Sequence, residues 1–181
     1  MDEKRRQFDA EVLPHLDAAY RFARWLTRSP NDADDLVQDA MLRAFRGFDG
    51  LRGVDAKPWL LTIVRNCHFT AKQRGKRFWW VPLPDDGDVV DSDAMIAVTP
   101  TPEDESMRVD EQRALMRLLA RLPTEQREVL VLREIEDLDY RQIAEVTSTP
   151  IGTVMSRLAR ARAALKTLWQ SEMEESAHGM R

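Results

Sequence analysis

The sequence predicts an all-helical protein of two small domains joined by an acidic flexible linker. Helical spacing of apolar residues recurs along the chain, strand-like alternation is hard to find, and only 7 of the 181 residues are glycine. A hydrophobic content of 43% is enough for a core, whereas 32% charged residues and a mean hydropathy of −0.48 are typical of a soluble protein. The single cysteine, Cys67, excludes an internal disulfide and a cysteine-rich zinc site.

The uneven charge distribution predicts the domain boundaries. Residues 1–80 hold 15 Lys and Arg against 11 Asp and Glu, residues 81–110 hold 1 against 9, and residues 111–181 hold 11 against 11. We therefore expect one domain at 1–80, an acidic linker at 81–110, a second domain at 111–170 and a disordered tail at 171–181. With no apolar run of the ~18 residues that a membrane span needs, and no signal-peptide pattern, the expected location is the cytoplasm.

Three helical segments are predicted before the linker. The first covers residues 8–27 and is interrupted by Pro14, which either starts or kinks a helix. The second covers residues 33–48, after a capping segment at 29–35 that is rich in Asp. The third begins at Pro58 and continues into a basic stretch.

The acidic residues at the start of the second segment have two interpretations. Asp32, Asp34, Asp35 and Asp39 have a spacing that could bind magnesium. They are also ordinary first-turn acids at a capped helix, and no second acidic cluster or phosphate-binding glycine loop accompanies them. Leu42 lies among charged residues on the predicted exposed side, which favours a protein-contact surface over a metal site. We expect no metal, no cofactor and no catalytic residue.

The basic stretch at residues 65–77 contains five cations and no acid, and is followed by Phe78, Trp79 and Trp80. Cations interleaved with aromatic residues suit a phosphate backbone with unstacked bases nearby. Alone, the pattern could equally be a solvated helix end. Cys67 and His68 have no partners for metal binding or acid-base chemistry, so we interpret them as structural or contact residues.

Residues 137–168 predict a helix-turn-helix. A short helix at 140–146 is followed by a polar break, Thr147, Ser148 and Thr149, and by a helix that begins at Pro150 and ends near Leu168. One side of the second helix is apolar, and residues 150–166 carry four cations and no acid. A basic helix alone is usually a solvated surface, but the turn and the small outward-facing residues favour a helix that enters the major groove.

These segments together resemble an extracytoplasmic-function (ECF, group-four) sigma factor of bacterial RNA polymerase, in the sigma-70 family. The resemblance rests on DADDLVQDAMLRAFRGF, KPWLLTIVRNCHFTAKQRGKR and LPTEQREVLVLREIEDLDYRQIAEVTSTPIGTVMSRLARARAAL, and it spans roughly residues 8–168. It implies that residues 1–80 are region 2 and residues 111–170 are region 4. The implied function is a non-enzymatic specificity subunit that directs RNA polymerase to promoters through their −10 and −35 elements.

The resemblance also implies three binding sites. The site for the clamp helices of the polymerase β′ subunit comprises Asp35, Leu36, Gln38, Asp39, Leu42 and Arg43. The −10 site, which captures a flipped base and the melted strand, comprises Arg52, Ile63, Arg65, Asn66, Lys72, Arg74 and Arg77. The −35 site, which reads duplex DNA, comprises Thr153, Met155, Ser156, Arg157, Arg160 and Arg162. Met155 departs from the Arg or Lys of many relatives, so an apolar contact, as to a thymine methyl group, would replace a polar one.

The implied partners are the RNA polymerase core, with its β′ and β subunits, promoter DNA and an anti-sigma factor. We expect no membrane contact of the chain's own, although a membrane-bound anti-sigma factor would hold it near the membrane. One alternative is a sigma-mimic adaptor that binds the anti-sigma factor without DNA, but its recognition helix would have lost the cations that Arg157, Arg160 and Arg162 supply here. An autonomous helix-turn-helix repressor and a magnesium enzyme are weaker alternatives.

Overall fold

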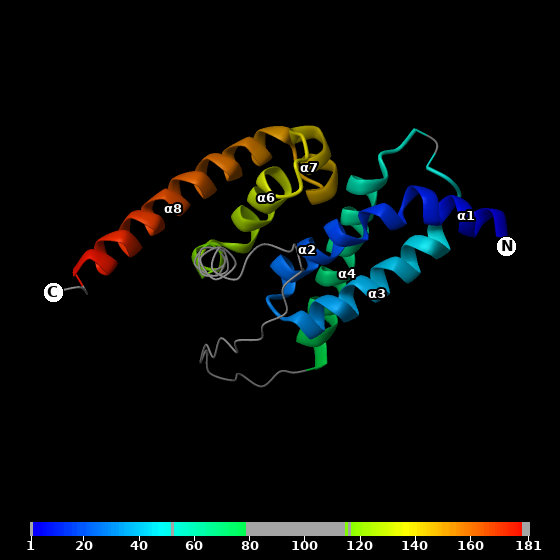
Figure 1. Ribbon diagram of the computed structural model, residues 1–181, viewed down its shortest axis with the longest axis horizontal. Helices are drawn as coiled ribbons and strands as arrows, with labels where there is room; N and C mark the ends of the chain where they lie inside the picture. The colour runs from blue at the N-terminus through cyan, green and yellow to red at the C-terminus, as the bar shows by residue number, and fades with distance from the viewer. Residues whose placement is uncertain (1, 52, 79–114, 116, 179–181) are drawn as a thin grey trace, which may run out of the picture. The chain divides into compact units, whose positions relative to one another are not determined.

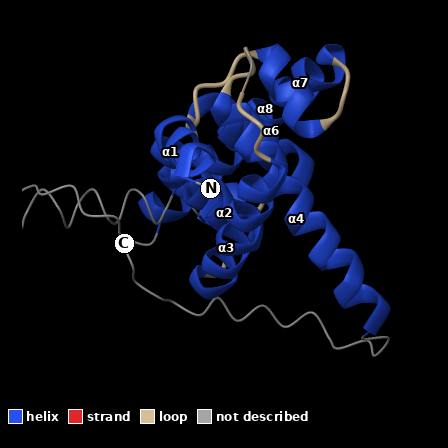
Figure 2. Cartoon of the chain, turned by 90° about the vertical axis from the view of Figure 1, so that its right-hand side faces the viewer, coloured by secondary structure: helices blue, strands red, loops and turns tan. Residues whose placement is uncertain are grey.

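A computed structural model describes residues 2–51, 53–78, 115 and 117–178 (Figure 1). Every regular element in these residues is helical, as Figure 2 shows, so the predicted all-α fold class is confirmed. The chain divides into two compact units, Met1–Ala94 with Arg141–Ser148, and Met95–Tyr140 with Thr149–Arg181. The expected linker, residues 81–110, lies outside the described residues, and the expected domain boundaries stay a prediction. No described helix combines the length and apolar character needed to cross a membrane.

The first unit is built on three helices that pack against one another: α2 (Leu16–Thr27), α3 (Pro30–Gly47) and α4 (Ala56–Phe78). They are preceded by α1 (Asp2–Glu11) and by the short 3-10 helix η1 (Leu13–His15). Pro14 lies in η1, between α1 and α2, so the predicted interruption at this residue is confirmed.

Aromatic side chains tie α1 to the end of α3 and the start of α4. Phe8 meets Phe45 and Phe48 edge to face, with ring centroids 5.2 and 5.4 Å apart, and Phe48 meets Trp59 at 6.4 Å. Phe8 and Phe48 are buried. Edge-to-face pairs at these distances add to the stabilisation that comes from burial alone. The loop between α3 and α4 is thereby anchored where α4 begins.

The junction of α2 and α3 differs from the prediction. Arg28 caps α2 in the left-handed conformation, with φ of 62°, and α3 begins at Pro30, not at residue 33. Ser29 is the N-cap, and its hydroxyl accepts a hydrogen bond from the backbone N–H of Asp32. Proline fits the first helical position because it has no N–H to satisfy there. The segment expected to be a turn is therefore the first turn of the helix.

The second unit contains α6 (Thr124–Glu134) and α8 (Ile151–His178), which pack against each other, and a helical stretch at residues 117–120. We expected α8 to end near Leu168 and a disordered tail to begin at residue 171, but the helix continues to His178. That expectation came from the polar character of the residues after Leu168. They include Glu, Gln, Met and Ala, which are good helix formers, and no Gly or Pro lies between Leu168 and Gly179.

A tight turn joins α7 (Tyr140–Thr147) to α8, as predicted. Ser148 has φ of 52°, in the left-handed region, and its N–H donates to the carbonyl of Glu145. Pro150 precedes the helix, and its carbonyl accepts from the N–H groups of Thr153 and Val154. A left-handed residue directly after a helix is an ordinary helix terminator, usually glycine.

Replacing Ser148 by Gly should stabilise the protein. A residue with a Cβ pays ~1–2 kcal/mol in the left-handed region, and glycine loses part of that gain to chain entropy, so we expect Ser148→Gly to raise the free energy of unfolding by about 0.5–1 kcal/mol. Urea denaturation measures this change. Ser148→Val, which puts a β-branched side chain at the same φ, should destabilise; equal effects of the two variants would contradict the explanation.

Candidate protein and nucleic-acid interfaces

The outer face of α3 presents a mixed apolar and charged surface. Asp35, Gln38, Asp39 and Arg43 are exposed, and the side chain of Leu42 among them is 56% exposed. Spacings of three and four residues put these side chains on one side of the helix. Leu36 does not belong to this surface, because it is 8% exposed and counts among the core residues. Its inclusion in the polymerase site came from the family pattern, and its burial assigns it to packing.

Asp39 and Arg43 form a two-point ion pair one helical turn apart. The Nη2 of Arg43 lies 2.8 Å from Oδ2 of Asp39, and its Nε donates to Oδ1 at 3.1 Å. The hydrogen bond to Asp39 raises the pKa of Arg43, so the guanidinium stays charged. Because both carboxylate oxygens of Asp39 are engaged, this acid is not an open metal ligand. The described residues contain no group of three or more side chains arranged to hold a metal ion.

Cys67 lies on the inner side of α4, behind this surface. It is buried, and burial raises the pKa of its thiol above the usual value, with Arg43 opposing and Asp39 reinforcing that change. A thiol that stays protonated is a poor nucleophile. Its neighbour His68 meets Phe69 edge to face, with ring centroids 5.3 Å apart. Both observations agree with the structural interpretation of these two residues.

On α4, the predicted −10 residues gather on the outer side. Asn66 is exposed, Ile63 and Arg65 are half-buried, and Lys72 is exposed one and a half turns further on. In the described part of the chain, the side-chain amide of Asn66 has no protein partner. Its backbone carbonyl accepts a hydrogen bond from the Thr70 hydroxyl at 2.7 Å. The amide is therefore available to another molecule. Arg52, and the side chains of Arg74 and Arg77, lie outside the described residues.

The structure adds an aromatic residue to this surface that sequence reasoning missed. The guanidinium of Arg65 lies over the ring of Phe69, 4.7 Å from its centroid, and Phe69 is half-buried. Phe69 follows Asn66 by three residues and Arg65 by four, so the three side chains share one side of the helix. This spacing was the available signal. A half-exposed ring beside a cation and an amide is the arrangement on which an unpaired base stacks.

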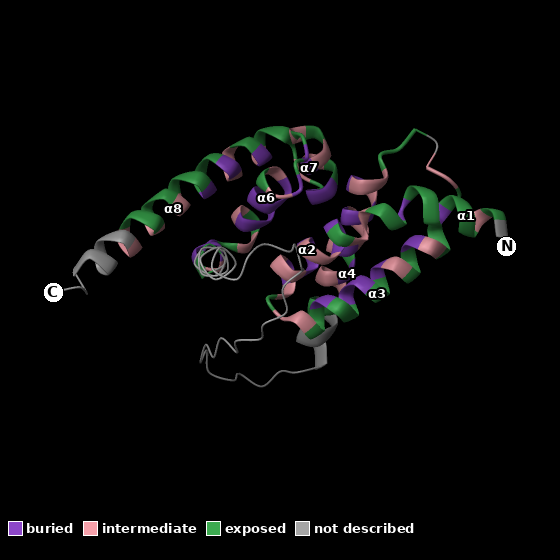
Figure 3. Cartoon of the chain, in the orientation of Figure 1, coloured by how far each residue is buried: buried purple, intermediate pink, exposed green. Residues whose placement is uncertain are grey.

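In the second unit, the first half of α8 has a buried and an exposed side, whereas its later described residues are exposed or half-buried, as Figure 3 shows. Val154, Leu158 and Ala161 are buried, whereas Ile151, Gly152, Met155, Ala159 and Arg160 are exposed. Thr153 and Ser156 are half-buried, and the Ser156 hydroxyl donates to the carbonyl of Thr153. A side chain added at Gly152 would meet none of the described residues within 4 Å.

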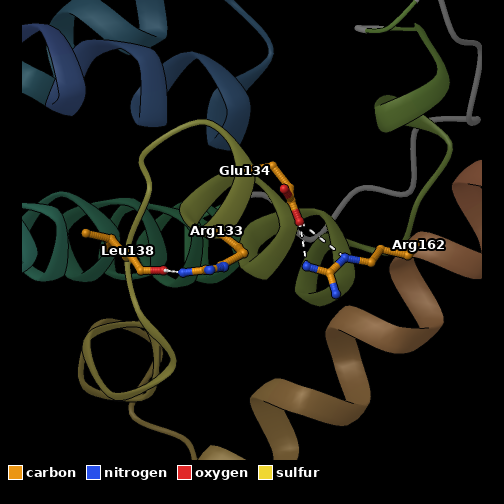
Figure 4. Close-up of polar contacts among 4 residues, drawn as sticks. All are labelled: Arg133, Glu134, Leu138 and Arg162. Atoms are coloured by element: carbon orange, nitrogen blue, oxygen red, sulfur yellow. Dashed lines mark hydrogen bonds and ion pairs between the residues drawn. The ribbon is translucent and has the colours of Figure 1, made fainter.

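Two of the four cations on α8 are held by α6. Arg157 forms an ion pair with Glu125 at 2.9 Å, and its side chain is only 18% exposed. Arg162 donates two hydrogen bonds to Oε1 of Glu134, at 2.6 and 3.2 Å, shown in Figure 4. The two acids lie in the first turn and at the last residue of α6, so α8 is clasped to both ends of that helix. Sequence reasoning missed both partners, because pairs 32 and 28 residues apart have no local signal.

The connection that follows α6 is also fixed by a cation. Nη1 of Arg133 donates to the carbonyl of Leu138 at 2.8 Å, as Figure 4 shows, and its guanidinium lies 5.4 Å from the ring centroid of Tyr140. The contact spans the loop between α6 and α7 and sets where α7 begins.

Comparison with known proteins shows which family the chain belongs to. The model for sigma-70 region 2 matches residues 12–78, and the model for sigma-70 region 4 matches residues 112–165. The ECF RNA polymerase sigma-E factor of Haemophilus influenzae is 33% identical over 168 residues, which cover 88% of each protein. The ECF RNA polymerase sigma factor SigE of Mycolicibacterium smegmatis is 32% identical over 174 residues, covering 94% of this chain and 64% of that relative.

A solved structure with a similar fold is the sigma factor RpoE from Bartonella quintana, crystallised with the anti-sigma factor NepR. Its TM-score is 0.66 at 29% identity, and the match covers 90% of this chain and 96% of that one. The fold is therefore that of a two-region sigma-70 protein. The chain belongs to the ECF RNA polymerase sigma factors, which are alternative sigma factors, and the resemblance read from its motifs is confirmed.

Replacing Arg162 by Met should cost a small, salt-dependent part of the stability. Both side chains of the Arg162–Glu134 pair are 50% exposed, and exposed pairs contribute about 0.2–1 kcal/mol. Urea denaturation should give a loss in this range at low salt that shrinks at high salt. Arg160→Met removes an exposed cation from the same helix and should change stability less. Equal losses for the two variants would contradict a clasp between α8 and α6.

Proposed function

We propose that this chain binds the core of RNA polymerase through α3 and directs initiation through α4 and α8, which contact the −10 and −35 elements of its promoters. It works by binding, without a catalytic step of its own, and it works in the cytoplasm, where polymerase and promoters are. Residues 1–80 act as region 2 and residues 111–170 as region 4, with 81–110 linking them.

The observation that carries the proposal is the outer face of α3. Leu42 is 56% exposed on a helix whose opposite side is buried, with the Asp39–Arg43 pair directly beside it. A single exposed leucine is common on protein surfaces, so what distinguishes this one is the polar side chains held around it. An apolar residue ringed by hydrogen-bonding groups is, in contrast, the usual composition of a protein interface. The β′ clamp helices are the partner that we assign to this face.

The outer side of α4 supplies the chemistry for a melted strand. The amide of Asn66 can donate to and accept from one base edge, which is what base discrimination requires. Phe69, with the guanidinium of Arg65 over its ring, puts an aromatic side chain and a cation beside that amide, which suits a base and its phosphate. Extruding a base costs a few kcal/mol, which stacking and hydrogen bonding together offset.

Control by an anti-sigma factor is part of the proposal. RpoE of Bartonella quintana was crystallised with such a protein, NepR. In this chain, the second unit has an apolar cleft that an inhibitor could cover, with the Glu134–Arg162 pair at its edge, lined otherwise by Leu115, Leu119, Leu130, Val131, Ile135 and Leu165. An anti-sigma protein encoded beside this chain should compete with polymerase core; failure of any such protein to compete would remove this part of the proposal.

Transcription in vitro tests the main proposal. Core polymerase supplied with the purified chain should start transcription at a distinct set of promoters, selected from genomic fragments, and core alone should not. Initiation from no fragment, by a folded chain free of inhibitor, would refute the proposal. Binding to an anti-sigma factor with no initiation would instead favour the sigma-mimic alternative.

Replacing Leu42 by Asp should weaken binding to polymerase core about tenfold or more, because a charge would be buried where an apolar anchor fits. Fluorescence anisotropy of the labelled chain titrated with core measures the dissociation constant. Leu13→Asp is the matched control, since Leu13 is a similarly exposed leucine, at 44%, outside the α3 face. Equal weakening by both variants would show a general effect of the charge and count against the assigned face.

Replacing Asn66 by Ala should reduce discrimination at one base of the −10 element about tenfold, the value of a good amide contact to a base edge. Initiation from a promoter set carrying each of the four bases at every −10 position measures it. Thr62→Val is the control, because the Thr62 hydroxyl donates internally to the carbonyl of Pro58. An equal loss on every promoter would argue against base reading by Asn66.

A further inference from the structure

The first two turns of α8 expose apolar side chains on the side that faces away from the core. Ile151 is 41% exposed and Met155, one helical turn later, is 53% exposed. Gly152 and Ala159 continue the same exposed side with small residues. This surface is apolar, and it lies at the N-terminal end of α8, the end that would enter a DNA groove first.

The cations of α8 do not cover this surface. Arg157 and Arg162 are turned to the two flanks, where Glu125 and Glu134 hold them. Arg160 and Lys166 are exposed, and neither has an ion pair with the part of the chain that the structure describes. Both lie further along the helix than Met155, where they can reach phosphates while its first two turns meet base edges. Arg157 and Arg162, which are paired with α6, hold α8 in position and are not assigned to DNA contact.

The partner that best suits an exposed apolar side chain on a cationic helix has a net negative charge and an apolar group at the point of contact. Residues 150–171 contain no acid, so a nucleic-acid duplex fits the charge of α8. In the major groove, the C5 methyl group of thymine is the apolar group on a base edge, and apolar side chains contact it. The long, flexible side chain of Met suits such a contact because it adapts to the position of the methyl group.

We infer that Met155, with Ile151 beside it, reads thymine methyl groups in the −35 element and makes this chain select T·A pairs facing the first two turns of α8. The inference rests on the proposed function and names the specificity of its duplex-reading site. It differs from reading by arginine, which would select guanine through two hydrogen bonds.

The test removes single methyl groups from the DNA. The full chain, assembled with polymerase core, selects duplexes from a library randomised over the −35 region. Each thymine in the selected element is then replaced by deoxyuridine, which lacks only the methyl group. We expect replacement at one or two positions to weaken binding about fourfold, the value of one buried methyl group.

Replacing thymine by deoxyuridine should not weaken DNA binding by the Met155→Gln variant, whose side chain has the same length but a polar end. The same change in the DNA should still weaken binding by the Met155→Leu variant. Trp169→Ala is the control, because Trp169 is 47% exposed on the same helix, far beyond Met155, and its loss should leave the sensitivity unchanged. A double-mutant cycle of protein and DNA changes isolates the contact. Thermal unfolding of each variant separates misfolding from lost contact.

Other outcomes overturn the inference separately from the proposed function. Insensitivity of the wild-type chain to every deoxyuridine, or unchanged sensitivity in Met155→Gln, refutes methyl reading while sequence-specific binding stands. Loss of holoenzyme assembly in a folded Met155→Gln variant would identify the surface as a protein contact and overturn methyl reading. Failure to select any −35 sequence would refute both.

Discussion

The packing of α8 on α6 decides what the second unit can do. Val154, Leu158 and Ala161 are buried, so the core takes one side of α8 over its first three turns. The ion pairs of Arg157 and Arg162 with α6 then occupy the flanks. What remains free is the side with Ile151, Met155 and Arg160. The surface that we propose for reading DNA therefore consists of the residues that the core does not bury. A change that rotates α8 would expose a different set of side chains there.

In the first unit too, helix packing decides which side chains stay exposed. Mutual packing of α2, α3 and α4 buries Leu36 and Cys67 and leaves Leu42 and Asn66 on outer sides. On α3 the ion pair of Asp39 with Arg43 holds two charged side chains still beside Leu42. Ordered polar groups lose less entropy when a partner binds, which favours the association that we propose for this face. On α4, Arg65 is similarly held over Phe69.

The predicted elements were correct where local chemistry governs them. Apolar spacing located the helices, Pro14 marked the break before α2, and the Ser148 turn separated α7 from α8. The helix ends were less accurate, since Pro30 begins a helix that we expected three residues later and α8 continues to His178. Both errors came from treating polar residues as non-helical, as a turn in one case and as a disordered tail in the other. Serine and proline also start helices, and polar Glu and Gln extend them when no breaker follows.

Sequence alone determined the fold class, the helix-turn-helix and the family, because these depend on periodicity, turn residues and motifs that are local along the chain. The tertiary structure decided which candidate residues are available to a partner. Leu36 is buried. Arg157 and Arg162 form ion pairs with acids 32 and 28 residues away. Phe69 lies under the guanidinium of Arg65, on the same side of α4 as Asn66. Availability depends on which side of each helix is buried and on pairs between distant helices. Those contacts exist only once the helices have packed.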